Sequence, residues 1–335
     1  MTKHITIKDI AREAGVSIAL VSFVMNNRIG ADGKQKYRVS EDTKKRILEV
    51  ANRLNYRPSS AARMLRKGRT RDIGVILSDT ANIFYGIIAR ELENWAFQHG
   101  YTMLFGSSDE DPEKFSKLVQ SFLNKDVEGF IVVPCVGSGP CVKQLMESGR
   151  PLVVIDRHHP DFDVPSVLTD NIDATEQAVK ALKEQGVNKI AFVSYAMRIS
   201  SMTDREETFR RIMGEDAIIW KMPFDRVDEE AERLADKIIQ MGIDGLITAS
   251  NVPSVALIKA LFNRGVRIQQ DVKLVSFDYS NVFDVFSPPI PHVQQPLAAI
   301  SSTAAEYLVK LIEAKAAGED ISGHKDKIIL KASLR

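Results

Sequence analysis

Cysteine is scarce in this 335-residue sequence: Cys135 and Cys141 are too few for a disulfide framework and lack zinc-site spacing. The longest apolar runs, such as 151–155, are far too short to cross a bilayer, so we expect no membrane association. Charged residues from Lys8 to Glu13 interrupt any signal-peptide core, and we expect a cytoplasmic protein. Hydrophobic residues make up 44% of the chain and charged residues 27%, a balance that excludes a largely disordered chain.

Motifs of common enzyme classes are also missing. The run 137–139 (Gly-Ser-Gly) follows a strand pattern but lacks the third glycine of a dinucleotide-binding loop. Of the six histidines only His158 and His159 are adjacent, and neither a His-Glu-x-x-His pattern nor a Gly-x-Ser-x-Gly elbow occurs. We therefore expect neither an enzyme nor a bound metal or cofactor.

Charge is distributed unevenly along the chain. Residues 1–70 contain seven Lys and nine Arg against three Asp and three Glu, a net charge of +10. Because the whole chain carries +1, the other 265 residues carry −9. A small basic region on a larger acidic one suggests that the basic region binds a polyanion, although it could also be an ordinary solvated face.

From residue 72 onward, short β-branched runs alternate with amphipathic segments. The strand-like runs are 73–77, 102–106, 130–133, 152–155, 190–193, 218–221, 246–248 and 274–277. The helical segments are 85–99, 113–125, 142–148, 174–185, 228–241, 254–264 and 297–317. This alternation is typical of parallel sheets buried on both faces, and its length predicts two α/β subdomains.

Ligands of such sheets bind at the carboxyl ends of the strands. The residues at these ends are Ser78, Asp156, Ser194, Ala249 and Asp278. The long helix at 297–317 is expected to cover the sheet of the first subdomain.

The first 70 residues show helical patterns without strands. Thr6 and Asp9 form a capping-box pattern, and Gly15 is the expected end of this first helix. Ser17 is expected to cap a second helix and Ser40 a third. Helices this short need a shared core, and two of them joined by a tight turn describe a helix-turn-helix.

Several separate stretches then match one family in the right order. They are ITIKDIAREAGVS at 5–17, Val21-Ser22, Asn26, LNYRP at 54–58 and ARMLRKGRT at 62–70. With these motifs the chain resembles the LacI/GalR family of bacterial transcription regulators over essentially its whole length. The resemblance implies an α/β fold class: an N-terminal helix-turn-helix head plus a two-lobed, periplasmic-binding-protein-like body with two parallel-sheet α/β subdomains.

The resemblance also implies a division into segments. Residues 1–58 would form the helix-turn-helix DNA-binding domain, 59–70 a hinge helix and linker, and 71–335 an effector-binding and dimerisation domain. Within that domain we expect lobe 1 at about 71–160 and 290–320, and lobe 2 at about 161–289 and 321–335.

In the family, the second helix lies in the major groove of DNA, and here it would span 17–26. Leu20 and Phe23 stand where most members carry Thr and Arg, so the outward face is almost entirely apolar. Such a face cannot form bidentate hydrogen bonds to guanine but can pack against thymine methyl groups; alternatively, Phe23 packs under the neighbouring loop. The residues expected to contact DNA are Thr6, Ser17, Ile18, Ala19, Leu20, Ser22, Phe23, Asn26, Arg28, Tyr56, Ala62 and Leu65.

Two further segments matter for DNA binding. The stretch 27–38 is basic and longer than the family's usual turn, and it either adds phosphate contacts or is tolerated surface. Residues 59–66 resemble the family's hinge helix, which is too short to be stable alone. By resemblance it orders on DNA beside its dimer mate, where Leu65 inserts into a minor-groove base step; the alternative is that Leu65 packs on the body.

The body resembles the sugar-binding-protein fold, with a ligand between its lobes. Carboxylates, an amide and a guanidinium group that converge with aromatic rings suit a sugar or another polyol. The expected effector-binding residues are Asn82, Phe84, Tyr85, Asp156, Arg205, Phe224, Asn251 and Asp278. The pair Ser250-Asn251 replaces the family's usual Asn-Asp, so the location of the pocket transfers better than its chemistry.

The resemblance therefore implies a sequence-specific DNA-binding transcriptional regulator of the LacI type, with repression favoured over activation, although the sequence leaves both open. It would bind a near-palindromic operator in double-stranded DNA as a homodimer, with its affinity modulated by a small-molecule effector, a sugar or sugar derivative. A sugar-binding protein serving transport would need an export signal and no basic head. An enzyme would need a catalytic constellation that the sequence does not offer.

Overall fold

A computed structural model describes residues 5–25, 39–56, 69–159 and 161–335. The chain divides into two compact units, Met1–Thr70 and Arg71–Arg335, here called the head and the body. Within the described ranges, no helix combines the length and the apolar character that a membrane span requires.

The described part of the head is helical, with α1 (Ile7–Ala14), α2 (Ile18–Met25) and α3 (Glu41–Arg53). The predicted capping box is confirmed: the backbone N–H and the hydroxyl of Thr6 both donate to the Asp9 carboxylate, at 2.9 and 2.7 Å. Gly15 ends α1 with φ 63°, a left-handed conformation that a residue without a Cβ adopts readily. Ser17 and Ser40 cap the next two helices as expected, their hydroxyl oxygens accepting backbone N–H groups at 3.2 and 3.3 Å.

One small apolar core joins these three helices. Ile10 from α1, Val21 from α2 and Ile47 from α3 are each 0% exposed at its centre. The side chains around them are Ala11, Ala14, Val50 and Ala51, with Leu20, Leu54 and Tyr56 packed partly against the cluster. Since no single helix of eight residues is stable alone, this shared core is what makes the head fold.

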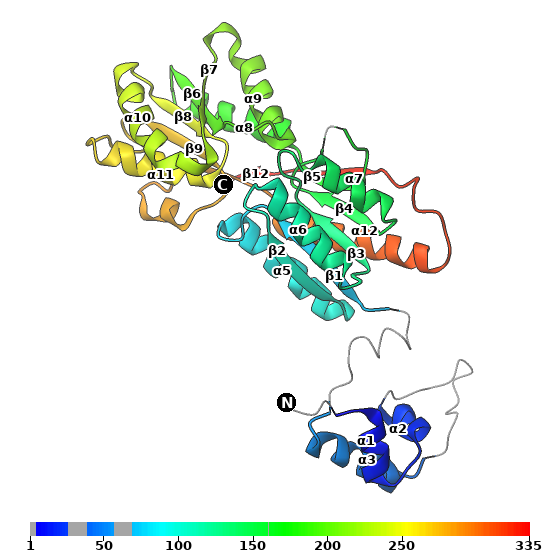
Figure 1. Ribbon diagram of the computed structural model, residues 1–335. Coiled ribbons are helices and arrows are strands. Elements are labelled where there is room, and N and C mark those ends of the chain that lie inside the picture. Colours follow the sequence, from blue (N-terminus) through cyan, green and yellow to red (C-terminus); the bar gives the residue numbers. More distant parts are fainter. Residues whose placement is uncertain (1–4, 26–38, 57–68, 160) are drawn as a thin grey trace. The chain divides into compact units, whose positions relative to one another are not determined.

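The body consists of two lobes, each built on a six-stranded sheet (Figure 1). The strand order is β11-β5-β4-β3-β1-β2 in lobe 1 and β12-β10-β9-β8-β6-β7 in lobe 2. The strands of lobe 1 are β1 (Asp72–Leu77), β2 (Thr102–Ser107), β3 (Gly129–Val132), β4 (Leu152–Ile155), β5 (Ser166–Thr169) and β11 (Lys327–Leu330). Those of lobe 2 are β6 (Ile190–Tyr195), β7 (Ile218–Met222), β8 (Gly245–Thr248), β9 (Lys273–Phe277), β10 (His292–Gln294) and β12 (Ser333–Leu334).

The two sheets share one topology and are mainly parallel. Strands β6 to β10 take the places in lobe 2 that β1 to β5 take in lobe 1, and β12 takes the place of β11. Among the described pairings, β10 with β12 is antiparallel and the others are parallel. The predicted pair of parallel-sheet subdomains is therefore confirmed.

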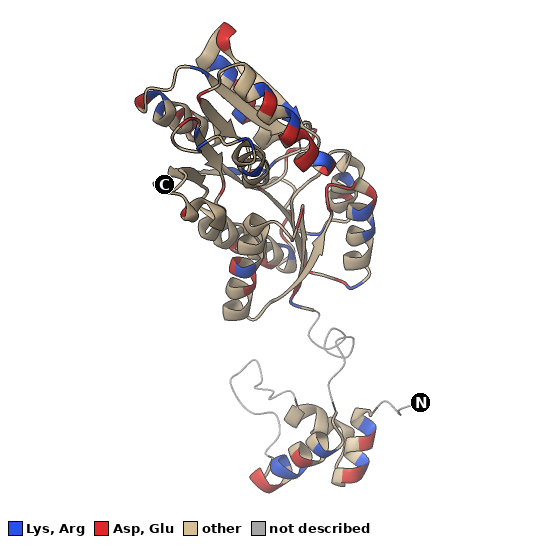
Figure 2. Ribbon diagram, turned by 90° about the vertical axis from the view of Figure 1, so that its left-hand side faces the viewer, with Lys and Arg blue, Asp and Glu red and all other residues tan. Residues whose placement is uncertain are grey.

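Helices cover both faces of each sheet, so the strands are buried on two sides. In lobe 1 they are α5 (Ile83–His99) and α12 (Leu297–Ala316) on one face, and α6 (Pro112–Leu123) and α7 (Gly139–Glu147) on the other. In lobe 2 they are α10 (Val227–Gln240) and α11 (Asn251–Phe262) on one face, and α8 (Asn171–Glu184) and α9 (Ser200–Met213) on the other. Figure 2 shows that the charged residues lie mainly on these helices, whereas the strands carry few. The long helix α12 packs on the sheet of lobe 1, as expected.

The expected lobe boundaries are wrong at three strands. β5 belongs to lobe 1, because it pairs with β4. β11 also belongs to lobe 1 through its pairing with β5, and β10 belongs to lobe 2 through its pairing with β9. Each of these strands has three or four residues next to a crossing between lobes, where hydrophobic pattern alone does not assign a sheet. The chain therefore crosses between the lobes three times, after β5, after β10 and between β11 and β12.

Candidate functional site

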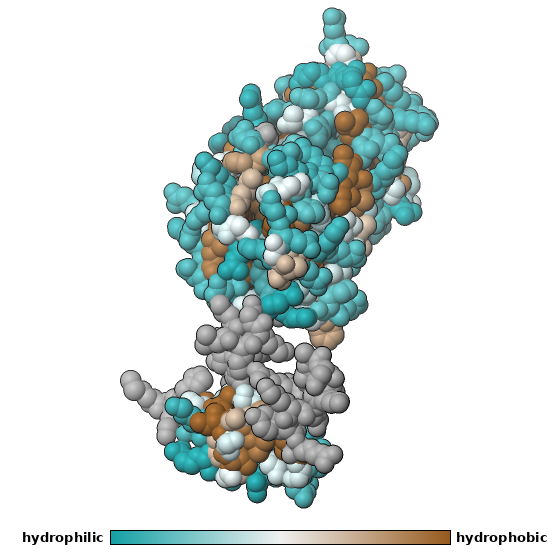
Figure 3. All heavy atoms as spheres, turned by 90° about the vertical axis from the view of Figure 1, so that its right-hand side faces the viewer, coloured by the Kyte–Doolittle hydropathy of each residue, from teal (hydrophilic) through white to brown (hydrophobic). Residues whose placement is uncertain are grey.

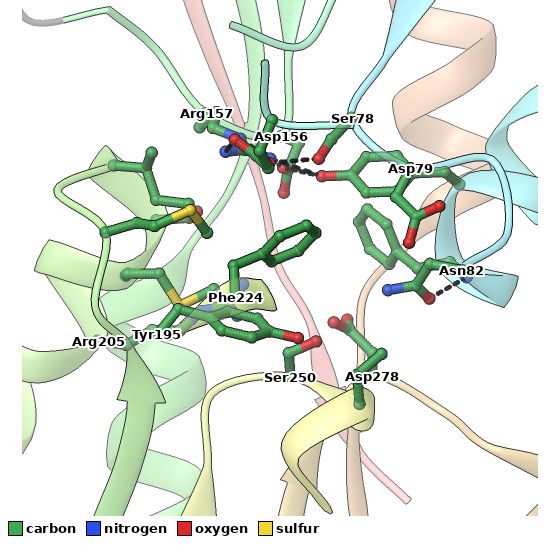
Figure 4. A pocket seen from close by; sticks show the side chains of 18 of the residues that line it. Ser78, Asp79, Asn82, Asp156, Arg157, Tyr195, Arg205, Phe224, Ser250 and Asp278 are labelled. Carbon is green, nitrogen blue, oxygen red and sulfur yellow. Dashed lines mark hydrogen bonds and ion pairs between the residues drawn. The ribbon is translucent and has the colours of Figure 1, made fainter. Parts of the chain in front are cut away.

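A cavity of about 230 Å³ lies between the two lobes of the body (Figure 4). It is lined by the loops that follow the carboxyl ends of strands in both sheets, and by the first turns of α5 and α9. Open α/β sheets bind ligands at such ends, because the polar loop groups converge there. Of the eight residues expected to bind an effector, seven line this cavity: Asn82, Phe84, Tyr85, Asp156, Arg205, Phe224 and Asp278.

The eighth, Asn251, lies beside the cavity at the start of α11. Its side-chain amide donates to the Oδ1 atom of Asn82 at 3.2 Å and to the carbonyl of Tyr279 at 3.0 Å. Asn82 caps α5, where its Oδ1 atom also accepts the N–H of Phe84 at 3.0 Å. Asn251 therefore connects lobe 2 to lobe 1 instead of lining the cavity.

In lobe 1, a buried network centres on Arg157, whose side chain is 4% exposed. The Nη1 and Nη2 atoms donate to the two carboxylate oxygens of Glu110 at 3.2 and 2.7 Å, and Nε donates to Asp156 at 3.3 Å. The Tyr85 hydroxyl donates to Asp156 at 3.0 Å and accepts from Arg157 at 2.9 Å. The Ser78 hydroxyl also donates to Glu110. Four of the five N–H groups of the Arg157 guanidinium are thus engaged by groups of its own lobe.

In lobe 2, Arg205 extends from α9 and is 1% exposed. Its Nε atom donates to Asn171 at 2.7 Å, its Nη1 atom donates to the Ala249 carbonyl at 2.6 Å, and its guanidinium lies 4.1 Å from the ring centroid of Phe277. The Nη2 atom makes no hydrogen bond to the described residues. Burial lowers the pKa of Arg205, but an arginine stays charged in proteins, so Nη2 is a donor available to a ligand.

Asp156 and Asp278 occupy equivalent places in the two lobes, directly after β4 and β9. Both have left-handed backbones, with φ 67° and 65°. Gln295 donates to one oxygen of Asp278 at 2.7 Å, and the second oxygen has no donor among the described residues. Burial raises the pKa of Asp278 to about 6, because the buried carboxylate loses the water that would stabilise its charged form.

Aromatic and sulfur-containing side chains provide the apolar part of the lining. The rings of Tyr195 and Phe224 in lobe 2 have centroids 5.4 Å apart, and those of Phe84 and Tyr85 in lobe 1 have centroids 4.9 Å apart. Figure 4 shows Phe224 in the middle of the cavity and the Tyr195 hydroxyl beside Ser250. Rings in such positions offer flat faces to the C–H surface of a ligand.

Sequence reasoning missed several lining residues. They are Glu110, Tyr195, Met197, Ile199, Ser201, Met202, Val252 and Gln295. Tyr195 directly follows the strand-end residue Ser194, so the rule of strand ends could have found it. Glu110 gave no such signal, because its inward direction depends on a left-handed backbone with φ 58°.

In the head, the start of α2 presents an apolar surface. Ile18 is 49% exposed and Ala19 is exposed. Figure 3 shows an apolar area on the described part of the head. Of the two positions considered for Phe23, the outward one is wrong and the packed one is favoured, because its side chain is only 8% exposed. Burial of a phenylalanine ring is worth roughly 1.5–3 kcal/mol, which favours the packed position.

The other residues expected to contact DNA have mixed positions. Thr6 and Ser17 are exposed helix caps, and Ser22 is half-buried on α2. Leu20 and Tyr56 are half-buried against the head core. Outside the described residues lie Asn26, Arg28, Ala62, Leu65, the basic stretch 27–38 and the expected hinge helix 59–66.

Two family models match the chain in separate ranges. Residues 6–59 match the model described as bacterial regulatory proteins, lacI family, and residues 179–334 match the periplasmic binding protein-like domain. The first range covers the described helices of the head and the second covers most of lobe 2.

Relatives extend this match over both units. The ribose operon repressor of Halalkalibacterium halodurans is 30% identical over 313 residues, which cover 92% of this chain and 91% of the relative. The HTH-type transcriptional regulator RegA of Clostridium saccharobutylicum is also 30% identical, with 92% and 93% covered. Catabolite control protein A of Staphylococcus epidermidis is 28% identical, with 91% and 92% covered.

Solved structures show the same fold. The Lac repressor bound to ONPG has a TM-score of 0.81 at 21% identity and covers 99% of this chain and 98% of its own. The transcriptional regulator CelR in complex with cellobiose has a TM-score of 0.67 at 22% identity, with 99% and 98% covered. Because relatives at 30% identity match the chain through head and body alike, the chain belongs to the LacI family of bacterial regulatory proteins.

Proposed function

We propose that this protein is a transcriptional repressor whose homodimer binds a near-palindromic operator in double-stranded DNA. A sugar or sugar derivative in the cavity between the lobes would modulate its DNA affinity. The protein would act in the cytoplasm and catalyse no reaction. The relatives named above are transcription regulators, which supports this role.

The observation that carries the effector part of the proposal is the set of unused polar groups in the cavity. Arg205 offers the Nη2 donor, Asp278 offers one carboxylate oxygen, and the Asn82 amide nitrogen makes no hydrogen bond to the described residues. Phe84 and Phe224 add apolar faces. Alternating hydroxyl and C–H surfaces of a sugar would satisfy donors, acceptors and rings together. The ribose operon repressor and the CelR–cellobiose complex support the same ligand class.

The DNA part of the proposal rests on the head. Its matched family model covers residues 6–59, and the exposed start of α2 would enter the major groove. A homodimer places one such helix on each half-site, and its two-fold symmetry requires a near-palindromic operator. In this arrangement Ile18 and Ala19 would contact thymine methyl groups, because they carry no hydrogen-bonding atoms in their side chains.

Coupling between the two sites would run through closure of the lobes. Hydrogen bonds between described residues of the two lobes already exist, among them Asn251 to Asn82 at 3.2 Å and the His158 N–H to the Ser200 hydroxyl oxygen at 3.0 Å. A ligand that bridges Arg205 and Asp278 of lobe 2 to Asn82 of lobe 1 would change the closure of the lobes. Such coupling is typically about 1–3 kcal/mol, or roughly 5–150-fold in affinity.

The experiment that tests this proposal uses the full chain. Thermal-shift screening of sugars identifies a stabilising compound, and an operator is selected from random double-stranded DNA. DNA affinity is then measured by fluorescence anisotropy with and without the sugar, and sugar affinity with and without DNA. We expect equal, reciprocal changes within the range given above. If saturating sugar leaves DNA affinity unchanged and DNA leaves sugar affinity unchanged, the proposal is wrong.

A further inference from the structure

Glu110 is a cavity residue whose side chain points at a cation of its own lobe. It stands in the loop between β2 and α6, and its side chain is 7% exposed. Glu110 and the preceding Asp109 both have left-handed backbones, with φ 58° and 52°. For residues other than glycine this conformation costs on the order of 1 kcal/mol each. The loop is therefore strained where it turns Glu110 inward.

The contact that results is a two-pronged ion pair. The two Nη atoms of Arg157 each donate to Glu110, which matches the planar geometry of a guanidinium facing a carboxylate. Asp156 accepts from the Nε atom of Arg157, and the Tyr85 hydroxyl accepts from Nη2. A phosphate or carboxylate group on a ligand would need the same face of Arg157 that Glu110 already occupies.

The cavity as a whole carries more negative than positive charge. Four carboxylates line it, from Asp79, Glu110, Asp156 and Asp278, against the two guanidinium groups of Arg157 and Arg205. An anionic ligand placed here would meet surplus negative charge in a buried setting, where charges are poorly screened. A neutral polyol meets no such repulsion.

We propose that Glu110 determines the charge class of the effector: by occupying Arg157, it makes the cavity select uncharged, hydroxyl-bearing ligands against their phosphorylated or carboxylated analogues. This inference rests on the proposed function, because it assumes that the cavity is the effector site. The negative charge of Glu110 would repel an anionic ligand, and such repulsion contributes to ligand selectivity in addition to attractive contacts. Glu110 is thus a specificity-determining residue that needs no direct contact with the effector.

The test replaces Glu110 by glutamine in the full chain, with inorganic phosphate as the probe. Glu110→Gln keeps the shape of the side chain but removes one of the two charged partners of Arg157 and leaves Asp156 as the other. Titration calorimetry should show that phosphate binds the E110Q protein at least about tenfold more tightly than the wild type, or than the detection limit if the wild type shows no binding, since hydrogen bonds between charged groups have that order of effect. The double variant Glu110→Gln with Arg157→Gln should lose the gain, because the freed cation is then absent.

Glu113→Gln is the matched control. Glu113 lies three residues along, at the start of α6, and its side chain is 84% exposed. It should behave as the wild type towards phosphate. A gain by E113Q equal to that of E110Q would show a general charge effect and would overturn the assignment to Glu110.

A second measurement uses the wild type alone, in case the E110Q protein does not fold. D-ribose and D-ribose 5-phosphate are compared, together with any sugar found by screening and its phosphate. We expect the phosphorylated member of each pair to bind at least about tenfold more weakly. Equal or tighter binding of the phosphorylated member, or no phosphate gain in a folded E110Q protein, overturns the inference. Because these are binding measurements without DNA, their outcome is separate from failure of the proposed regulation.

Discussion

The head and the body hold their candidate recognition groups in opposite environments. In the head, Ile18 and Ala19 are exposed on a helix held by a core with seven buried apolar side chains in the described residues. In the body, Arg205 and Asp278 are buried between two covered sheets and already have partners. An exposed contact can therefore be altered with little loss of stability, whereas a buried one affects stability and binding together.

The largest effect is expected from the small core of the head. Ile47→Ala removes a side chain that is 0% exposed and should destabilise the head by about 2–5 kcal/mol. A core this small has little stability to lose, so DNA binding should be abolished while the body still unfolds as in the wild type. Circular dichroism during urea unfolding and DNA anisotropy measure the two effects.

The neighbouring Leu48 offers the matched control, because its side chain is 40% exposed. Leu48→Ala should leave both readouts nearly unchanged. Equal losses from both substitutions would mean that the head is not held by the core described above.

The next effect concerns a buried charge in the body. Asp278→Asn should raise the free energy of unfolding at pH 7 by up to about 3 kcal/mol, because each unit of pKa shift corresponds to about 1.4 kcal/mol. The folded pKa of about 6 lies above the ordinary value of 3.8, so the folded state binds the proton more tightly than the unfolded state. Ionisation of Asp278 therefore costs stability as the pH rises through 6, and the advantage of asparagine should vanish near pH 4. Asparagine also tolerates the left-handed backbone at this position.

Urea unfolding at pH 7 and at pH 4.5 measures this difference. Asp271→Asn is the control of opposite sign, because hydrogen bonds from Arg267 lower the pKa of the exposed Asp271 to about 2. Asparagine at 271 should give no gain at pH 7. An advantage of D278N that is the same at both pH values would contradict the role of its charge.

The smallest effect is expected at the exposed face of the head. Replacing operator thymines by deoxyuridine removes only methyl groups and should weaken binding by the wild type a few-fold, since a buried methyl is worth about 0.8 kcal/mol. Ile18→Ala should bind thymine-containing DNA less tightly and lose its sensitivity to deoxyuridine. Anisotropy titrations of both proteins on both duplexes form the double cycle.

Leu48→Ala serves again as the control, because it removes exposed apolar surface from α3 and not from α2. It should keep the full response to deoxyuridine. If Ile18→Ala keeps that response as well, Ile18 does not contact a thymine methyl.

The sequence predicted what depends on local pattern and missed what depends on distant contacts. Helix caps such as Thr6 and strand runs such as 152–155 follow from neighbouring residues and were found. The sheet to which β5 and β10 belong depends on pairing across the chain, and each strand is too short to reveal it. The lobe boundaries therefore could not be read from composition.

The residues of the candidate site also fall into those that local sequence pattern predicts and those that it does not. Asp156 and Asp278 were found because they follow strands of parallel sheets, where binding loops converge. Glu110 was missed because the direction of its side chain depends on its backbone angle. For Phe23 the sequence leaves an outward and a packed position open, because eight residues of apolar sequence do not show which side of a helix is covered.

The three crossings between the lobes lie side by side. The Thr169 hydroxyl contacts the side-chain oxygen of Gln295 at 2.5 Å, and the Asp170 N–H donates to the Leu330 carbonyl at 2.8 Å. A single connecting segment would permit torsion as well as bending, but three adjacent ones resist torsion. We therefore expect the lobes to move mainly by bending at these crossings, and under the proposed function a ligand in the cavity would act by setting the angle between the lobes.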